Sequence, residues 1–270
     1  MKVFAIESDS DINRISGYLF YYEKSKAFLI ELPNDADEWN TPLILSSFAK
    51  RGRYSVDSMS SIAWVRQRIV PYDRQNIACI MKQYSMKNYD EFELLEVSNG
   101  RCAQDDYFIL PIEKEMLPKH ITNRLNKRIS EIIPIDNFRI IVFFRNGKTK
   151  MIEIKPLCSQ NKFKAIINDE QLFRKVKIDV DGFGITWGKN LVISAEELYA
   201  AKGNTIPIKN EDLKCFIKTR VIDTDGAEEL LDCSRQNISD LVKREKMKPV
   251  QSFKSVKLFL ISEVQQRLWR

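Results

Sequence analysis

The chain is short of the residues that most catalytic and metal sites use. It has one histidine, His120, in 270 residues. A metal site built from several histidines is therefore excluded, and a Ser-His-Asp or Cys-His site would have to use that one residue. His120 lies at the start of a basic segment, PKHITNRLNKR, and we interpret it as a surface residue. The sequence predicts no catalytic residue, no metal site and no cofactor, so we expect the protein not to be an enzyme.

Cysteines are few and widely separated. There are five of them, an odd number, and no two are spaced as CxxC: Cys79, Cys102, Cys158, Cys215 and Cys233. This pattern argues against a disulfide framework and against a zinc site. We expect buried free thiols.

Long apolar runs are also missing. No stretch approaches the roughly 20 apolar residues that a membrane-spanning helix needs. The first residues, MKVFAIESDSD, do not have the apolar core of a signal peptide. The sequence therefore predicts a cytoplasmic protein without a membrane partner.

Positive charge is concentrated near the end of the chain. Residues 234–270 contain nine basic and three acidic residues, an excess that equals the net charge of +6 of the whole chain. Such a local excess is typical of a module that binds phosphate groups, although a solvated basic surface is the simpler alternative.

The length and the order of apolar patterns predict an α+β multidomain protein. We expect an N-terminal α+β domain over residues 1–134, a small central α+β domain over 135–203, a linker at 204–211 and a C-terminal winged helix-turn-helix over 212–270. In the first domain we predict a strand over residues 2–7 and a hairpin that turns at residues 23–26. Residues 117–133 carry isoleucine and leucine at helical spacing, which predicts a helix.

Two segments of the chain begin alike. DRQNIACIMKQYSM starts at Asp73, and SRQNISDLVKREKM starts at Ser234. Both have a residue that can cap a helix, followed by Arg-Gln-Asn-Ile, so both predict capped amphipathic helices. The question is whether both helices bind nucleic acid.

The central region predicts two strands joined by a turn at Asn146-Gly147, a short helix, further strands and a closing helix capped by Ser194. The segment from Phe173 to Val176, Trp187 and the closing Glu197-Leu198-Tyr199 complete the pattern. In this order the region resembles the bacterial domain-of-unknown-function family numbered 2442. The resemblance implies a small α+β fold and no catalytic residues.

The C-terminal region predicts a helix capped within residues 223–225, a tight turn at Asp232-Cys233 and a second helix capped by Ser234. The second helix of such a pair fits the major groove of DNA, and its first residues reach base edges. Arginine pairs well with guanine, and glutamine or asparagine with adenine. The pattern thus predicts base contacts by Arg235, Gln236 and Asn237.

Cationic and hydroxyl side chains around this helix predict contacts to DNA phosphates. They are Ser234, Lys243, Arg244, Lys246, Lys254 and Lys257.

ELLDCSRQNISDLVKREKMKPV, followed by KLFLISEV, resembles the winged helix-turn-helix of the excisionase and MerR-like group. The resemblance implies a wing that contains Lys254 and Lys257. It departs from the group in two places: the turn has Asp232 where glycine is common, and the wing has no glycine. Aspartate tolerates a left-handed backbone better than most residues, so the turn remains feasible.

The N-terminal region contains a set of arginines that forms a secondary candidate for nucleic-acid or acidic-protein binding: Arg51, Arg53, Arg66, Arg68 and Arg74. Pairing of these arginines with nearby carboxylates is the simpler alternative. The adjacent carboxylates Asp105 and Asp106 fit a catalytic pair, but such pairs in a hairpin are more often solvated.

We expect the protein to bind double-stranded DNA, as a bacterial or phage transcriptional regulator. The alternative is a protein-interaction factor, such as an antitoxin or a nuclease inhibitor, with an autoregulatory DNA-binding tail. In that case a protein partner binds through residues 1–203. A homodimer is expected only by analogy with other half-site readers.

Overall fold

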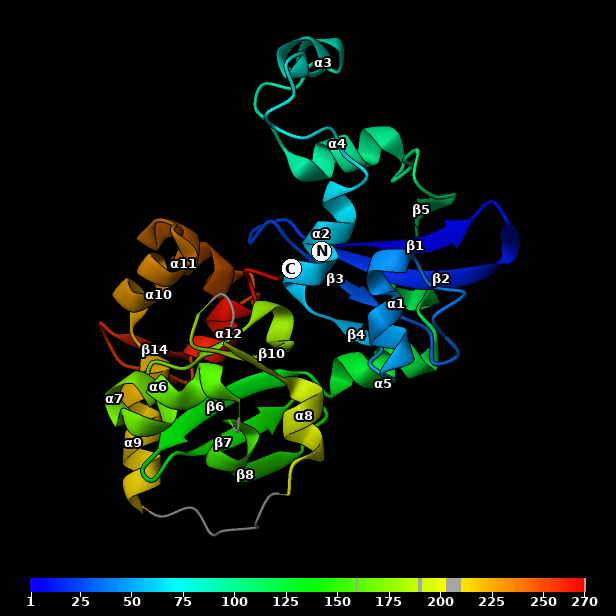
Figure 1. Ribbon diagram of the computed structural model, residues 1–270. Helices are drawn as coiled ribbons and strands as arrows, with labels where there is room; N and C mark the ends of the chain where they lie inside the picture. The colour runs from blue at the N-terminus through cyan, green and yellow to red at the C-terminus, as the bar shows by residue number, and fades with distance from the viewer. Residues whose placement is uncertain (159, 189–190, 203–209, 270) are drawn as a thin grey trace. The chain divides into compact units, whose positions relative to one another are not determined.

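The computed structural model of the chain describes residues 1–158, 160–188, 191–202 and 210–269. The chain divides into two compact units, residues 1–122 and residues 123–270 (Figure 1). Within the described residues, no helix is both long enough and apolar enough to cross a membrane. The structure is mixed α+β with several small sheets.

A five-stranded antiparallel sheet forms the centre of the first unit. Its order is β4-β3-β2-β1-β5. The strands are β1 (Lys2–Ser8), β2 (Asp11–Tyr22), β3 (Ala27–Glu31), β4 (Ser55–Val56) and β5 (Tyr107–Pro111). The predicted first strand and the hairpin with its turn at residues 23–26 are both confirmed, because β2 ends at Tyr22 and β3 begins at Ala27.

Three helices of the first unit, α1 (Leu43–Lys50), α2 (Ser58–Arg66) and α4 (Glu91–Ser98), contribute buried residues to the core beside this sheet. The unit also contains α3 (Ile77–Gln83) and a 3-10 turn, η1 (Lys114–Met116). Trp64 of α2 and Leu95 of α4 are fully buried in one core with Phe28 and Ile30 of β3. In contrast, α3 has no buried residue and lies apart from the sheet of its unit (Figure 1).

The single helix expected over residues 117–133 is wrong. A helix, α5 (Lys119–Asn126), ends before Lys127, and β6 (Ile129–Ile135) begins two residues later. Isoleucines at 129 and 132 fit helical spacing, but β-branched residues also favour strands. Pairing with β7 decides between the two, since Ile132 lies opposite Val142 in the sheet. The predicted boundary between residues 134 and 135 falls at the end of this strand, and the division into three domains stays a prediction.

The second unit begins with two three-stranded sheets. One has the order β6-β7-β8, with β7 (Arg139–Phe144) and β8 (Thr149–Glu153). The other has the order β11-β10-β9, with β9 (Lys177–Ile178), β10 (Gly184–Thr186) and β11 (Val192–Ser194). The helices between and after them are η2 (Lys155–Cys158), η3 (Asn161–Phe163), α6 (Lys164–Asn168), α7 (Glu170–Phe173), η4 (Val180–Gly182) and α8 (Ala195–Ala200). As predicted, Ser194 caps α8, and it does so in a reciprocal pair with Glu197.

The last part of the second unit contains α9 (Asn210–Arg220), β12 (Val221–Ile222), α10 (Thr224–Leu231), α11 (Arg235–Lys243), β13 (Gln251–Ser252), β14 (Lys257–Leu260) and α12 (Ile261–Gln265). Its strands form a small antiparallel sheet of order β12-β14-β13. The last helix, α12, begins at Ile261, and Ser262 is buried within it. Most of the predicted linker, residues 204–209, lies outside the described residues, while residues 210–211 belong to α9.

Contacts of α9 attach this last part to the first sheet of the unit (Figure 1). Phe216 packs against an apolar cluster of Ile133, Ile135, Ile141 and Met151. Arg220 Nε lies 2.9 Å from Glu131 Oε1 and donates to the Ile132 carbonyl oxygen at 2.7 Å. Glu131 is buried, and burial raises the pKa of its carboxyl group although Arg220 opposes the shift.

Candidate nucleic-acid interface

Residues 231–238 build the N-terminal end of α11. Asp232 ends α10 with a left-handed backbone, φ 49°, which gives the sharp turn without glycine. Ser234 then caps α11, and its Oγ accepts a hydrogen bond from the backbone NH of Asn237 at 3.4 Å. Ile238 is buried in a core with Ala227 of α10 and other apolar residues. One face of α11 is thus fixed, and its first turn projects outward.

The three predicted base-contact residues occupy that first turn. Arg235, Gln236 and Asn237 are all exposed. Arg235 Nη1 lies 3.4 Å from Asp225 Oδ1 of α10, and both side chains are largely exposed. Because an exposed ion pair contributes only about 0–1 kcal/mol, Arg235 can leave Asp225 for a stronger acceptor.

Three of the predicted phosphate-contact residues lie at the other end of α11, whereas a fourth, Ser234, is its N-cap. Lys243, Arg244 and Lys246 are exposed. The backbone turns at Glu245, φ 54°, and brings Lys246 back so that its NH bonds the Leu241 carbonyl oxygen at 2.9 Å.

A shallow hollow runs along α11 and joins both kinds of residue. It is lined by Ser234, Gln236, Asn237, Asp240, Leu241, Arg244 and Lys246. Asp240 places a carboxylate among these donors, and Lys243 Nζ lies 4.0 Å from it. The surface is therefore mixed in chemistry, with donors in the majority.

The hairpin β13–β14 carries the two remaining predicted residues, Lys254 and Lys257. The Phe253 NH bonds the Val256 carbonyl oxygen at 2.7 Å, so the turn between the strands is tight although none of its residues is glycine. Lys254 is exposed and Lys257 is half-buried. Phe253, next to Lys254 in the chain, is also exposed, so an apolar side chain lies at the surface of this turn.

The first RQNI segment has a different local structure. The helix α3 begins at Ile77, after Arg74, Gln75 and Asn76, and Asn76 makes no side-chain cap. The expected cap by Asp73 is therefore wrong. Ile77, Ile80 and Met81 are only half-buried. No core fixes the orientation of α3 in the way that Ile238 fixes α11.

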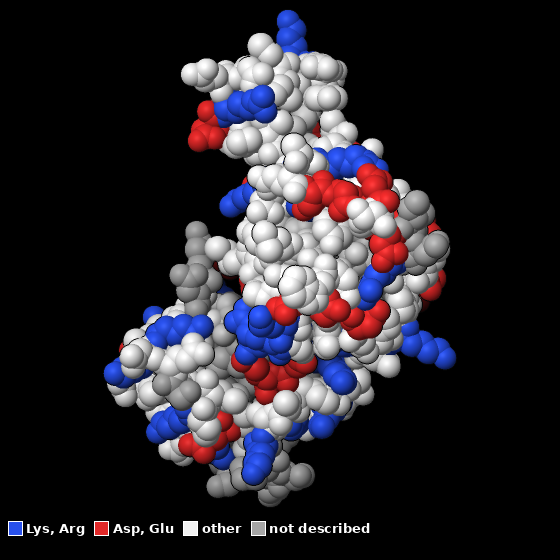
Figure 2. All heavy atoms as spheres, turned by 45° about the vertical axis from the view of Figure 1, so that its right-hand side comes forward, with Lys and Arg blue, Asp and Glu red and all other residues white. Residues whose placement is uncertain are grey.

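The secondary arginine set does not form one exposed surface. Arg68 is 3% exposed, lies 3.9 Å from the centroid of the Trp64 ring and pairs with Asp105 at 2.6 Å. Arg66 pairs with Glu91 at 2.6 Å. Arg51 donates to the Ser47 carbonyl oxygen at 2.7 Å. On the face drawn in Figure 2, acidic and basic side chains are interspersed and form no continuous positive area.

The remaining members, Arg53 and Arg74, are both exposed. Two of the five arginines, Arg66 and Arg68, thus pair with carboxylates as the simpler alternative expects, and binding by the set stays a prediction.

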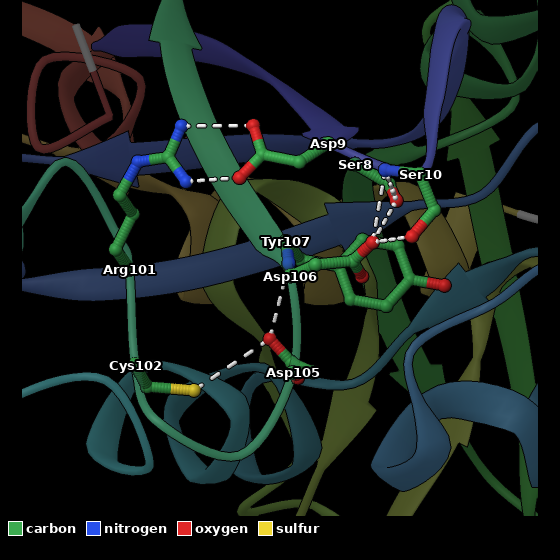
Figure 3. Close-up of polar contacts among 8 residues, drawn as sticks. All are labelled: Ser8, Asp9, Ser10, Arg101, Cys102, Asp105, Asp106 and Tyr107. Atoms are coloured by element: carbon green, nitrogen blue, oxygen red, sulfur yellow. Dashed lines mark hydrogen bonds and ion pairs between the residues drawn. The ribbon is translucent and has the colours of Figure 1, made fainter.

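Asp105 and Asp106 point to different partners (Figure 3). Asp106 accepts hydrogen bonds from the hydroxyls of Ser8 and Ser10 and from the Ser10 NH at 2.9 Å. The serine hydrogen bonds lower the pKa of Asp106. Asp105 accepts from Arg68 and, at 3.2 Å, from the Tyr107 NH. Asp106 therefore ties the loop before β5 to the turn between β1 and β2, whereas Asp105 binds Arg68, which follows α2. The two carboxylates do not face one another as a catalytic pair.

The burial of His120 and of the five cysteines differs in part from what the sequence predicts. His120 is half-buried in α5, so the surface interpretation holds only for part of its ring. All five cysteines are free, as expected, but only Cys158 is buried, and Cys79 of α3 is exposed. Within the described ranges no group of histidine, cysteine or carboxylate side chains could hold a metal ion.

Comparison with known proteins gives one match. Residues 129–204 match the family model of DUF2442, a protein of unknown function. The predicted resemblance of the central region is thereby confirmed, and the matched segment begins at β6 rather than after it. Comparison with the curated proteins and with the solved structures gives no match.

Proposed function

We propose that residues 221–269 form a winged helix-turn-helix that binds double-stranded DNA, and that the protein is a transcriptional regulator. The observation that carries the proposal is the start of α11. There Arg235, Gln236 and Asn237 are exposed on a helix whose opposite side is fixed by the buried Ile238. These residue types match guanine and adenine edges in the major groove.

Three further features support this function. Helices α10 and α11 are joined by a short turn, as in DNA-binding helix pairs. The strands β13 and β14 form a small hairpin after α11, in the position of a wing. Exposed cations lie at the far end of α11, where phosphate contacts would fix its register.

A mobility-shift experiment with the upstream DNA of the encoding gene tests the proposal. The variant Arg235→Ala with Gln236→Ala removes two base readers, each worth about 1–3 kcal/mol of discrimination, so the shift should weaken by at least tenfold. The matched control is Arg74→Ala with Gln75→Ala, which changes the same residue types in the first RQNI segment. The control should bind as the unaltered chain does.

Absence of any shift at low salt, or an equal loss in both variants, would contradict the proposed function. Footprinting on the same DNA then reports the length of the site. Two protected half-sites separated by about one helical turn, roughly 34–36 Å, would support a dimer.

A second function has its own observation, in the first unit. Trp39 is 86% exposed and Leu43 is 90% exposed. Asp37 Oδ1 accepts hydrogen bonds from the backbone NH groups of Trp39 and Asn40, at 2.8 and 2.9 Å, so the loop that presents Trp39 is held in one conformation. Exposed tryptophans on ordered loops are typical energetic centres of protein interfaces. This feature favours the protein-interaction factor with an autoregulatory tail.

Purification from the native host separates the two functions. A stoichiometric partner that is retained after truncation at Gly203, and that is lost on Trp39→Ser with Leu43→Ser, supports the second function. The same double variant should leave the DNA shift unchanged if the two functions are independent.

A further inference from the structure

Three lysines of the second unit converge on one tyrosine, Tyr199 of α8. Lys148 Nζ lies 4.3 Å from the centroid of the Tyr199 ring, and Lys127 Nζ lies 5.3 Å from it. Lys150 Nζ donates to the backbone carbonyl oxygens of Tyr199, at 2.7 Å, and of Ala201. The lysines come from the end of α5, the β7–β8 turn and β8, so only the tertiary structure brings them together.

The tyrosine is held in place from two sides. The Phe144 ring of β7 packs edge-on against it, with centroids 4.9 Å apart. Asn146 Nδ2 donates to Tyr199 Oη at 3.1 Å. A fixed ring limits the positions of the two ammonium groups beside it, which are attracted to its face. We call this group of residues the Tyr199 lysine cluster: Lys127, Lys148, Lys150 and Tyr199.

The lysines of the cluster have no carboxylate partners among the described residues, unlike two arginines that lie close to them in the chain. Arg128 and Arg145 both pair with Asp181, Arg128 being buried and Arg145 lying at 2.7 Å. In the part of the chain that the structure describes, no carboxylate lies within ion-pair distance of Lys127, Lys148 or Lys150. The same two chain segments therefore provide arginines to a closed internal ion pair and lysines to an open surface.

Gathering like charges without counterions is unfavourable for the protein alone. Burial, and secondly the nearby Lys148, lowers the pKa of Lys150. An anion at this surface would remove the mutual repulsion and stabilise the charged form of all three lysines.

We propose that the Tyr199 lysine cluster binds phosphate groups of a nucleic-acid backbone. Lysine binds phosphate as a compact point charge without demanding a fixed geometry. Lys127 and Lys148 are exposed, so the surface is open to a polymer that offers phosphates repeatedly. The choice of nucleic acid as the polymer rests on the function proposed for α11, which belongs to the same compact unit. Binding here is independent of base sequence.

The test uses the full chain with Arg235→Ala and Gln236→Ala, so that the contribution of α11 to base reading is removed. Lys127→Gln with Lys148→Gln is then added; Lys150 is kept because it bonds two backbone carbonyls. The matched control adds Lys155→Gln with Lys162→Gln. These lysines also lie over aromatic rings of the same unit, at 4.6 Å from Phe138 and 5.0 Å from Phe163, and their loss changes the net charge equally.

Fluorescence anisotropy of a labelled duplex of arbitrary sequence is measured over a series of salt concentrations. Each lost phosphate contact should reduce the magnitude of the slope of log affinity against log salt concentration by about 0.9. The cluster variant loses two lysines, so its slope should decrease by about twice that amount, and it should bind the duplex several-fold more weakly. The control should keep its slope. An unchanged slope in the cluster variant, or an equal decrease in the control, would overturn the proposal.

Inorganic phosphate provides the second arm. Inorganic phosphate is titrated while the NMR resonances of the Tyr199 lysine cluster are followed. If these resonances shift but duplex binding does not depend on Lys127 and Lys148, the site binds small anions, and the assignment to nucleic acid is overturned. The sequence-specific shift by the unaltered chain is a separate measurement. Its failure would count against α11 as a base reader and leave the result for the lysine cluster intact.

Discussion

The two RQNI segments share the sequence Arg-Gln-Asn-Ile, but they differ in where the helix begins and in which side chains are buried. Ser234 caps α11, and Arg235 to Asn237 form its first turn. In the other segment the helix starts only at Ile77, so Arg74 to Asn76 precede it. Ile238 is buried, whereas Ile77 is half-buried. The comparison shows that a sequence match at a helix start predicts a helix nearby but not which residues it presents.

The largest expected difference concerns the matched isoleucines. Ile238→Ala removes a buried side chain from the core of the C-terminal module and should lower the free energy of unfolding by about 2–5 kcal/mol. Ile77→Ala should lower it by less than about 1 kcal/mol, because a half-exposed side chain leaves no cavity. Urea unfolding, followed by hydrogen exchange of peptides from each unit, measures both. Equal effects would show that α3 has a core of its own.

The next largest effect concerns the attachment of the C-terminal module, for which α3 has no counterpart. Arg220→Ala removes the ion pair with Glu131 and the hydrogen bond to the Ile132 carbonyl oxygen, and should cost about 1.5–3 kcal/mol at neutral pH. Arg174→Ala is the matched control, since Arg174 pairs with the exposed Asp136 and should contribute about 0–1 kcal/mol.

The effect of Arg220→Ala should depend on pH. Burial raises the pKa of Glu131, so its contribution to stability is fully present below the ordinary glutamate pKa and is lost as pH rises through the raised value. Loss of Arg220 raises that pKa further. The variant should therefore be closer to the unaltered chain at acidic than at neutral pH, and Glu131→Gln should remove this dependence. A loss that is independent of pH would contradict the role given to Glu131.

A smaller difference is expected for the two segment starts. Ser234→Ala removes a helix cap and should destabilise the second unit by about 1 kcal/mol. Asp73→Ala removes no cap, because α3 begins beyond it, and should change stability by at most about 0.5 kcal/mol. Thermal unfolding followed by circular dichroism distinguishes them. A similar loss on Asp73→Ala would show that α3 starts earlier in solution.

The smallest effect concerns the ion pair between Asp225 and Arg235. Asp225→Asn frees Arg235 and removes a negative charge near bound phosphates, so affinity for duplex DNA should rise by at most about 1 kcal/mol. Anisotropy measurements at low and high salt check this, with Asp73→Asn as the control in the first segment. A decrease in affinity would show that Asp225 orients Arg235 for binding.

Much of the local structure could be predicted from particular residues. The hairpin of β2 and β3, the capping pair at Ser194 and Glu197, and the turn with Asp232 each follow from short-range rules, because the groups that hold them are close in sequence. The helix ending at Asn99-Gly100 shows where such rules become ambiguous. The same dipeptide fits a hairpin turn or a helix end, and here left-handed Asn99 ends α4.

Some residues of the candidate site could also be predicted from the sequence, and others could not. The exposed residues of α11 were predictable, since a cap and an apolar spacing fix which side chains face outward. The Tyr199 lysine cluster was missed because Lys127 and Lys148 lie far apart in the chain and carry no local pattern. The burial of Arg68 was missed for a similar reason: its partner Asp105 is 37 residues away.

The sequence by itself determined the helix caps at Ser194 and Ser234, the hairpin turn at residues 23–26 and the turn at Asp232, since each depends on residues within a few positions of one another. It also carried the family resemblance of the central region. The tertiary structure alone decided that residues 129–135 form a strand, that α3 lacks a core, and that lysines gather around Tyr199. Those outcomes depend on which distant segments pair and which charges are neutralised. Long-range contacts supply that information, and no local pattern contains it.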